Sequence, residues 1–206
     1  MQNPFIQSVP VLSKTQVEEV NKFLDDSHFQ RYKSTIFGTD GFREDTSVRS
    51  SLGFTLAEGE FYTGLIGQAI NEALLVYRDR LFSVHPAMSQ SLVPGTAGTS
   101  SHREAIQILE YGPDQKYNFH YDMNWDRSAE TYYRTVSVVL YLTSDFEGGG
   151  TEFVDKVYKA KPGHALIFPS HWSFPHSGQL VTSGMKRVAV TWYYVYPTPQ
   201  LITRVK

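Results

Sequence analysis

A histidine and an aspartate stand two residues apart in the aromatic stretch 117–122. Aromatic residues favour β-strands, and residues i and i+2 of a strand point to the same face of the sheet. His120 and Asp122 are therefore expected to look one way from this strand, while Tyr117 and the other aromatic residues look the other way. An imidazole and a carboxylate side by side can occupy two positions on a divalent metal ion.

A third ligand is needed to complete such a site, and the last third of the chain offers His176 within Pro175–Gly178. Two histidines and one carboxylate, with the remaining coordination positions open, are typical of non-haem Fe(II) sites. A histidine and an aspartate at this spacing also occur by chance, and alone they would be read as a half-buried strand pair. The rest of the chain has to decide between these two interpretations.

The composition limits the classes of protein to consider. A chain of 206 residues with 41% hydrophobic and 19% charged residues suits one globular domain with a sizeable core. The net charge of −2 argues against a nucleic-acid-binding protein, which usually has a basic excess. The chain has no cysteine, which excludes disulfides and thiolate metal sites. Histidine, aspartate and glutamate remain as the strong metal ligands.

Targeting signals are not visible in the sequence. The first residues lack a basic region followed by an apolar run, so no signal peptide is expected. No window approaches the ~18 consecutive apolar residues of a membrane span. We therefore expect a cytoplasmic protein without a membrane partner.

The periodicity changes from helical to strand-like along the chain. Ser13 and Gln16 have the spacing of a capping box that opens a first helix, and 60–81 has the broad apolar face of a second helix. A strand is expected within 48–56, and the Gly- and charge-rich stretch 38–45 is expected to be a loop. Short strands with turns between them then predict a sandwich or barrel. Their expected ranges are 105–111, 117–122, 135–142, 151–154, 157–160, 165–168, 174–178 and 188–196.

Several further motifs follow the histidine and aspartate in a fixed order. Lys186 comes ten residues after His176, and Trp192 comes six residues after Lys186. With them, 105–196 resembles the double-stranded β-helix (jelly-roll) core of the Fe(II)/2-oxoglutarate-dependent oxygenases, and most of all their prolyl 4-hydroxylase branch. The other matching features are Tyr111, Tyr117, the strand RTVSVVLYL from Arg134 to Leu142, the turn Gly149-Gly150-Thr151-Glu152-Phe153 and the apolar strand Ala165–Phe168.

The resemblance implies an α+β, mainly β fold, in which N-terminal helices support a jelly-roll core. We expect one catalytic domain over 1–206. In this interpretation 1–104 supplies mainly helical support and connections, and 105–196 forms the jelly-roll. The N-terminal half matches the family only loosely, through its helices and Arg49-Ser50-Ser51.

The resemblance also implies the cofactors and the residues that hold them. Fe(II) would be bound by His120, Asp122 and His176, with 2-oxoglutarate and O2 as cosubstrates and ascorbate as an optional reductant. The distal carboxylate of 2-oxoglutarate needs a cation inside the barrel, because an unpaired buried charge is costly. The residues implied for its pocket are Lys186, Thr151, Tyr111 and Tyr117, with Tyr141 as a further candidate for contact with the carboxylate.

Adjacent residues of a strand face opposite ways, so only one of Lys186 and Arg187 can enter the barrel. The family spacing selects Lys186, and Arg187 is expected to be an outward, solvated charge. Arg134 and Trp192 match positions that face the substrate in the family. The alternatives are a surface charge for Arg134 and a core strand residue for Trp192.

The expected activity is hydroxylation of a substrate C–H bond, with succinate and CO2 as coproducts. The favoured substrate is a prolyl residue in a peptide or protein, bound as an extended segment across the barrel mouth under the loops 123–133 and 38–45. One alternative is the same chemistry on another protein side chain, a free amino acid or a small metabolite. Another is a jelly-roll that binds metal or ligand without turnover, or a zinc hydrolase with the same three ligands.

Overall fold

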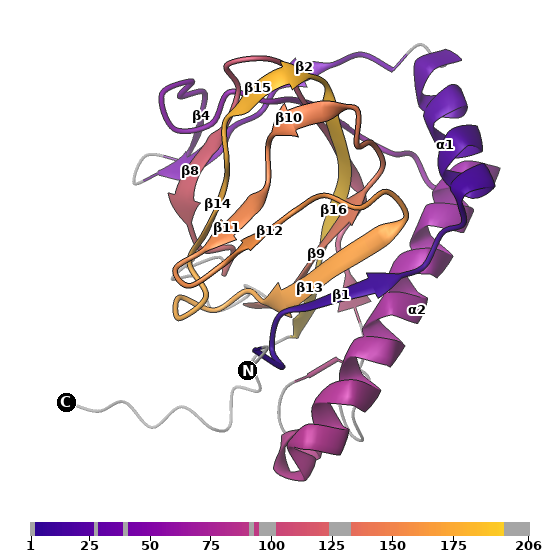
Figure 1. Cartoon of the computed structure of the whole chain (residues 1–206), viewed down its shortest axis with the longest axis vertical. Coiled ribbons are helices and arrows are strands. Elements are labelled where there is room, and N and C mark those ends of the chain that lie inside the picture. The colour runs from indigo at the N-terminus through magenta and orange to yellow at the C-terminus, as the bar shows by residue number, and fades with distance from the viewer. Residues whose placement is uncertain are drawn as a thin grey trace.

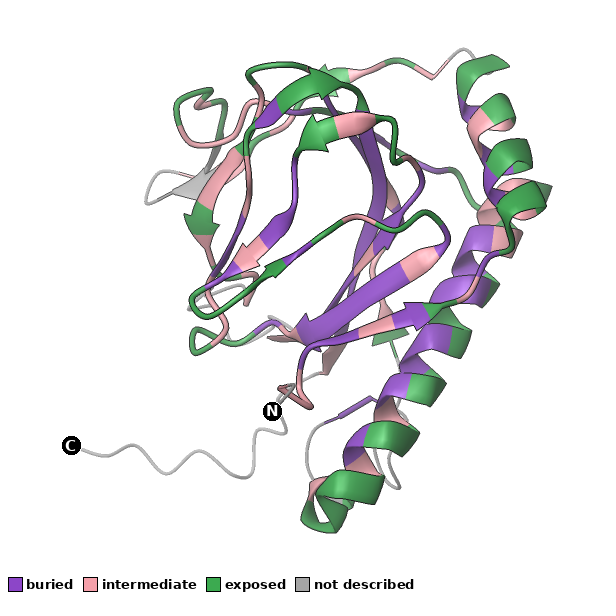
Figure 2. Cartoon of the chain, viewed as in Figure 1, coloured by how far each residue is buried: buried purple, intermediate pink, exposed green. Residues whose placement is uncertain are grey.

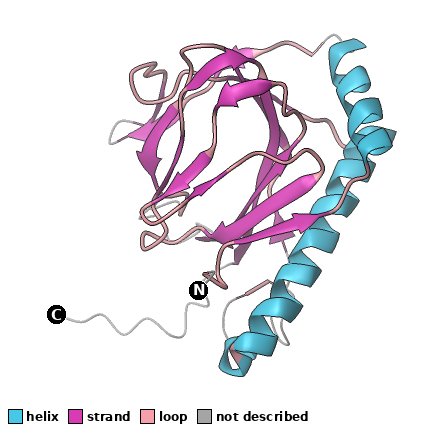
Figure 3. Cartoon of the chain, in the orientation of Figure 1, coloured by secondary structure: helices cyan, strands magenta, loops and turns pink. Residues whose placement is uncertain are grey.

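The computed structural model describes residues 3–26, 29–38, 41–90, 93–94, 102–123 and 133–195. Strands form a barrel-like body, and two helices lie along one flank of it (Figures 1 and 3). This is the mainly β architecture with supporting helices that the sequence predicts. No helix in these ranges is long and apolar enough to cross a membrane.

The large sheet is the wall of the barrel that carries the helices. Its order is β1-β13-β9-β16-β7-β5-β2, and β6 also pairs with β16. All of the pairings are antiparallel, and the longest strands lie in the middle of the sheet. The strands are β1 (Gln7–Pro10), β2 (Tyr32–Lys33), β5 (Leu52–Thr55), β6 (His102–Arg103), β7 (Gln107–Tyr111), β9 (Tyr133–Tyr141), β13 (His164–Pro169) and β16 (Lys186–Val195).

A smaller sheet forms the opposite wall, in the order β12-β11-β14-β8. Two further pairs, β10 with β15 and β3 with β4, complete the described strands. The space between the two walls is filled by aromatic and aliphatic side chains from both sheets. The strands are β3 (Ile36–Gly38), β4 (Gly41–Arg43), β8 (Tyr117–His120), β10 (Phe146–Gly148), β11 (Thr151–Phe153), β12 (Val157–Tyr158), β14 (His176–Gly178) and β15 (Val181–Gly184).

The helices α1 (Lys14–Asp26) and α2 (Phe61–Val84) bury their apolar faces on the outer side of the large sheet (Figure 2). The predicted capping box is present: the Ser13 backbone N–H donates to Gln16 Oε1, and the Gln16 N–H donates to Ser13 Oγ. A short 3₁₀ helix, η1 (Pro86–Gln90), follows α2. The apolar side chains that α1 and α2 pack against the large sheet form a second hydrophobic core, which lies outside the barrel.

The N-terminal part contains more strand than its sequence pattern predicts. The stretch expected to be a loop, 38–45, carries most of the β3–β4 hairpin, in which Ile36 pairs with Arg43. Residues 39 and 40 lie outside the described ranges. The strand expected within 48–56 is confirmed as β5, which pairs with β7 of the jelly-roll. Backbone pairing, which composition does not reveal, brings β1, β2, β5 and β6 into the large sheet.

Candidate metal centre

Three side chains converge at one end of the barrel. His120 ends β8, Asp122 lies two residues further on, and His176 begins β14 directly opposite His120 in the sheet. His120 Nε2 lies 3.4 Å from Asp122 Oδ1, and His176 Nε2 lies 3.5 Å from Asp122 Oδ2. One ligand atom from each residue can be chosen so that all lie within 4.8 Å of one another. The structure thus brings the three predicted ligands together.

The backbone fixes the orientation of both imidazoles. His120 Nδ1 lies 2.8 Å from the Asn118 carbonyl oxygen, and His176 Nδ1 lies 3.2 Å from the Phe174 carbonyl oxygen. A carbonyl oxygen can only accept, so each Nδ1 carries the proton and donates. In the neutral rings both Nε2 lone pairs then point toward the Asp122 carboxylate. Two lone pairs and an anion facing one another fit a cation between them, so the residues present suit a divalent metal.

The charge states of the buried ligands suit the same role. Burial lowers the pKa of His176 to about 4, so the imidazole is neutral at physiological pH. Burial alone would raise the pKa of Asp122, but His176 and His120 hold it well below its ordinary value. Asp122 is therefore an anion beside the neutral His176 imidazole, which is the protonation state that metal ligation requires of these two residues.

Strand β8 does not alternate as the sequence pattern predicts. Its register against β14 shifts: His120 faces His176, while Tyr117 faces Gly178, so three steps on β8 match two on β14. This β-bulge turns Tyr117 to the same side as His120, and their ring centroids lie 3.6 Å apart. The expectation that Tyr117 looks away from His120 is wrong, because a bulge adds a residue that alternation does not allow for. Burial raises the pKa of Tyr117 to about 12, so its phenol is neutral.

A buried cation lies inside the barrel near the three ligands. Lys186 is 4% exposed, and its Nζ lies 5.1 Å from the centroid of the Tyr111 ring. Among the described residues no carboxylate pairs with it, and burial lowers its pKa to about 8. A Cβ on Gly178 would lie 3.9 Å from Nζ, and Gly178 is two residues beyond His176, about 7 Å along a strand. This spacing is on the scale of a five-carbon dicarboxylate.

Hydroxyl groups extend this pocket. Tyr141 Oη and Thr151 Oγ1 are 2.5 Å apart, and both side chains are buried. Thr151 is placed by the glycine turn before it: Gly148 and Gly149 have φ values of +73° and +61°, which disfavour other residues. A Cβ at Gly148 would also lie 2.2 Å from a backbone oxygen. The predicted pocket residues therefore lie in one interior region, with Tyr141 among them.

The model of the 2OG-Fe(II) oxygenase superfamily matches residues 106–195, which hold all three converging ligands and Lys186. The match covers a little less than half of the chain. A protein of Acanthamoeba polyphaga mimivirus, assigned as a prolyl 4-hydroxylase, is 33% identical over 107 residues, which is 44% of this chain and 44% of that protein. The chain spans about half the length of the curated relatives it matches.

Solved structures establish the fold of this protein. A viral collagen prolyl hydroxylase from Paramecium bursaria Chlorella virus-1, in its 2OG complex, aligns with a TM-score of 0.62 and 18% identity. The alignment covers 93% of this chain and 96% of that chain. A Trichoplax adhaerens prolyl hydroxylase, in complex with a hypoxia inducible factor peptide, aligns with a TM-score of 0.62 and 16% identity, over 94% and 84% of the chains. The double-stranded β-helix predicted from the sequence is thereby confirmed.

Two further predicted residues lie beside the three candidate metal ligands. The Arg134 guanidinium lies 3.8 Å from the centroid of the Trp192 ring and donates to the Asp122 carbonyl oxygen at 3.4 Å. Arg134 also forms a two-point ion pair with Glu104, with contacts of 2.6 and 2.7 Å. Trp192 is buried, and its indole helps to keep the pKa of Asp122 low. Arg134 is thus held rigidly next to the ligands and is not a free surface charge.

Arg187 requires a correction. It points away from the barrel interior, as predicted, but it is 2% exposed and not solvated. Its guanidinium contacts Glu110 at 2.8 Å and Asp25 of α1 at 2.7 Å, and Arg31 binds the other Glu110 oxygen. Burial alone would raise the pKa of Glu110, but the two arginines hold it below its ordinary value. The sequence misled because helix α1, distant in the chain, covers this face of β16.

We expect Arg187→Met to lower the free energy of unfolding by roughly 3 kcal/mol, because removing one partner of a buried ion pair leaves the other uncompensated. Arg31 still binds Glu110, which keeps the loss at the lower end of the range. Urea unfolding measures it. Asp25→Ala is the matched control: its side chain is 61% exposed, so the loss should stay below about 1 kcal/mol. Equal losses of unfolding free energy in the two variants would contradict the idea that the buried Arg187 matters more than the exposed Asp25.

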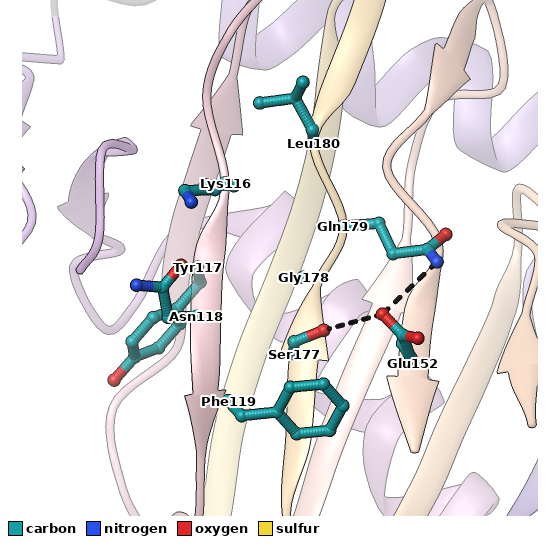
Figure 4. A pocket seen from close by; sticks show the side chains of 9 residues that line it. All are labelled: Lys116, Tyr117, Asn118, Phe119, Glu152, Ser177, Gly178, Gln179 and Leu180. Carbon is teal, nitrogen blue, oxygen red and sulfur yellow. Dashed lines mark hydrogen bonds between the residues drawn. The ribbon is translucent and has the colours of Figure 1, made fainter. Parts of the chain in front are cut away.

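The outer face of the small sheet is separate from the ligands. Figure 4 shows an open groove there, lined by the consecutive residues 116–119 at β8, by 177–180 at β14 and by Glu152. Ser177 and the Gln179 side chain each donate to Glu152 at 3.3 Å. Ser177 follows His176 directly, so the alternation of β14 places the ligand inside and the groove outside.

Some residues of the site were not singled out from the sequence. Arg49, which the sequence links only loosely to the family, lies over the Tyr117 ring at 4.8 Å, on a ring that also stacks on His120. Glu104 binds Arg134, yet it lies just before the expected core. Ser137 donates to Asp122 Oδ2 at 2.7 Å. The sequence does contain a signal for Ser137, because this serine interrupts an otherwise β-branched and apolar run.

Proposed function

We propose that this protein is an Fe(II)- and 2-oxoglutarate-dependent hydroxylase that acts on a prolyl residue in a peptide or protein. The observation that carries the proposal is the pairing of two features in one barrel. Two imidazoles and a carboxylate converge at its mouth, and the buried Lys186 has no anionic partner among the described residues. A metal-binding module or a zinc hydrolase requires the first feature but not the second.

The residues divide the work between metal and cosubstrate. His120, Asp122 and His176 would hold Fe(II), and their fixed Nδ1 hydrogen bonds keep both Nε2 atoms available for it. When bound, Fe(II) and 2-oxoglutarate supply the oxidising chemistry: O2 is consumed, 2-oxoglutarate yields succinate and CO2, and one oxygen atom enters the substrate C–H bond. No general base or nucleophile is required of the protein.

The interior cation would receive the cosubstrate. A carboxylate beside Lys186 gains a charge-assisted hydrogen bond in a water-poor space, and it relieves the cost of a buried lone cation. The Tyr141 and Thr151 hydroxyls bond each other, which leaves one hydroxyl proton of the pair to donate to the carboxylate. Tyr111, which is the cross-strand neighbour of Lys186, forms part of the wall. Binding at this end would leave the other end of the dicarboxylate directed toward the metal ligands.

The prolyl substrate is supported by relatives and by the residues at the mouth. The mimivirus relative is assigned as a prolyl 4-hydroxylase, and both solved structures bear names of prolyl hydroxylases. Arg134 offers donors for a peptide carbonyl, and Trp192 offers an aromatic wall beside the metal ligands. The expected covering loop 123–133 falls mostly outside the described residues. Ascorbate as a reductant and a cytoplasmic location stay predictions.

The test is the formation of succinate from 2-oxoglutarate in air with Fe(II), with and without a panel of proline-rich peptides. Mass spectrometry then looks for a peptide mass increase of one oxygen atom. Stimulation of succinate by a prolyl peptide, with matching hydroxylation, supports the proposal. Succinate without peptide hydroxylation points to another substrate of the same chemistry. No binding of 2-oxoglutarate at all would remove the oxygenase activity itself.

Arg134→Met should lower kcat/KM for the peptide by about 100-fold, because substrate misplacement by an ångström costs that much. Metal affinity and peptide-independent turnover of 2-oxoglutarate should stay near wild type. The variant leaves the half-buried Glu104 unpaired, so Arg134→Met is also combined with Glu104→Gln, which restores neutrality. An unchanged peptide rate in both variants would return Arg134 to a purely structural role.

A further inference from the structure

A chain of two buried hydroxyl groups stands behind the carboxylate ligand. Ser137 Oγ lies 2.7 Å from Asp122 Oδ2, and Ser170 Oγ lies 2.8 Å from Ser137 Oγ. Both serines are 1% exposed. Ser137 lies on β9 and Ser170 directly follows β13, so both are positioned by the large sheet, whereas the histidine ligands belong to the small one.

The direction of the hydrogen bonds follows from the geometry at Asp122. Ser137 Oγ donates to the Asp122 carboxylate, which acts as the acceptor. A hydroxyl has a single proton, so Ser137 cannot also donate to Ser170. Ser170 therefore donates to Ser137, and both O–H dipoles point toward the carboxylate. Hydrogen bonds aligned in this way polarise and strengthen one another.

Asp122 needs such support more than the two histidines do. His120 and His176 lie opposite each other within the sheet, and a backbone carbonyl fixes each ring. Asp122 lies beyond the end of β8, where no strand pairing fixes its side chain. The nearest backbone anchor is the Met123 N–H, which donates to the Ser170 carbonyl oxygen at 2.8 Å. Ser170 thus tethers the segment of Asp122 through both its backbone and its side chain.

We propose that Ser170 and Ser137 are positioning residues that hold the Asp122 carboxylate in the orientation that binds the metal. The inference rests on the proposed function, because it assumes that Asp122 is a metal ligand. Ser137 fixes Oδ2 directly, and Ser170 acts through Ser137. The large sheet thereby orients a ligand that the small sheet's strand no longer holds. Partners of this kind typically contribute 10–100-fold to metal affinity.

The test measures binding of Co(II) to the metal-free protein by calorimetry, without turnover. We expect Ser137→Ala to weaken Co(II) binding by about 10–100-fold. Ser170→Ala should weaken it by several-fold, because Ser137 keeps its hydrogen bond to Asp122 but loses the group that orients it. In the double variant Ser170→Ala should add nothing, since the hydroxyl through which it acts is gone. Ser137→Thr keeps the donor and should restore most of the affinity.

Ser8→Ala is the control, because it removes a hydroxyl hydrogen bond to His164 on the same sheet, away from the ligands. It should leave Co(II) affinity unchanged. If Ser137→Ala does not fold, Ser170→Ala carries the test, with thermal unfolding of each variant as the check. Wild-type affinity in the serine variants, or additive losses in the double variant, would overturn the inference alone. Absence of Co(II) binding by the wild type would overturn the proposed function together with it.

Discussion

His176→Ala is expected to abolish metal binding and turnover while the chain stays folded. His176 supplies a neutral, oriented Nε2 at 3.5 Å from the carboxylate, and alanine offers no donor. Loss of positioning partners alone costs 10–100-fold in affinity, so loss of a ligand should cost more than about 100-fold. The imidazole also packs against the Phe168 ring, with centroids 4.6 Å apart, so a modest loss of thermal stability accompanies it. Calorimetry with Co(II) and succinate formation with Fe(II) measure the two main effects.

His171→Ala is the matched control for this prediction. His171 lies five residues earlier and is exposed, and the described hydrogen bonds of its side chain are with the Ser173 hydroxyl and backbone. Its ring lies 5.0 Å from that of the exposed Trp172. Its replacement should leave metal affinity and turnover intact. Should His176→Ala still bind Co(II) as tightly as His171→Ala does, the metal centre assigned to the three residues would be wrong.

Lys186→Met should remove 2-oxoglutarate binding and at the same time stabilise the free protein. The fall of the Lys186 pKa from 10.5 to about 8 corresponds to roughly 3 kcal/mol of unfavourable burial at neutral pH. The cost is fully present below pH 8 and is relieved as pH rises toward 10.5, because the folded chain loses its proton before the unfolded one. Methionine removes that cost, together with the cation that the distal carboxylate requires.

The affinity for 2-oxoglutarate should therefore depend on pH. With Zn(II) as a redox-inert ion, wild-type affinity should fall as pH rises above about 8, where Lys186 loses its charge. Lys186→Arg keeps a cation throughout this range and should lose that dependence. Zn(II) affinity should be almost equal in all three proteins. Equal losses of Zn(II) and 2-oxoglutarate in Lys186→Met would contradict the separate role of the lysine.

Much of the site could be predicted from the sequence, because the spacing of residues within one strand or turn determines how they lie in the folded protein. The family resemblance selected His176, Lys186 and Trp192 by their spacing. Lys186 and Trp192 are six residues apart on β16, so the period of two places them on one face. Glycines before Thr151 mark a turn that only glycine tolerates well. The helices were found from their apolar stripes, and the capping box fixed the start of α1. Rules about neighbouring residues were sufficient wherever a single helix, strand or turn determines where a side chain lies.

The rest depends on contacts between distant segments. The bulge in β8 exists only in register with β14, so the inward turn of Tyr117 could not be read from alternation. Arg187 is buried by α1, which lies more than 150 residues earlier in the chain. Ser170 has no local signal at all, because its partner Ser137 lies on a different strand. Propensity and period carry no information on such pairings.

The neighbours Lys186 and Arg187 at the start of β16 have a consequence for the register of the whole sheet. A slip of β16 by one residue would exchange the two sides of the strand. The guanidinium would then enter a cavity without counter-ions among the described residues, and the ammonium would face Glu110 with the wrong length and geometry. Hydrophobic patterning is a weak guard here, because β16 is buried on both faces. The two adjacent charges need different surroundings, so they specify a single register of β16 in the sheet.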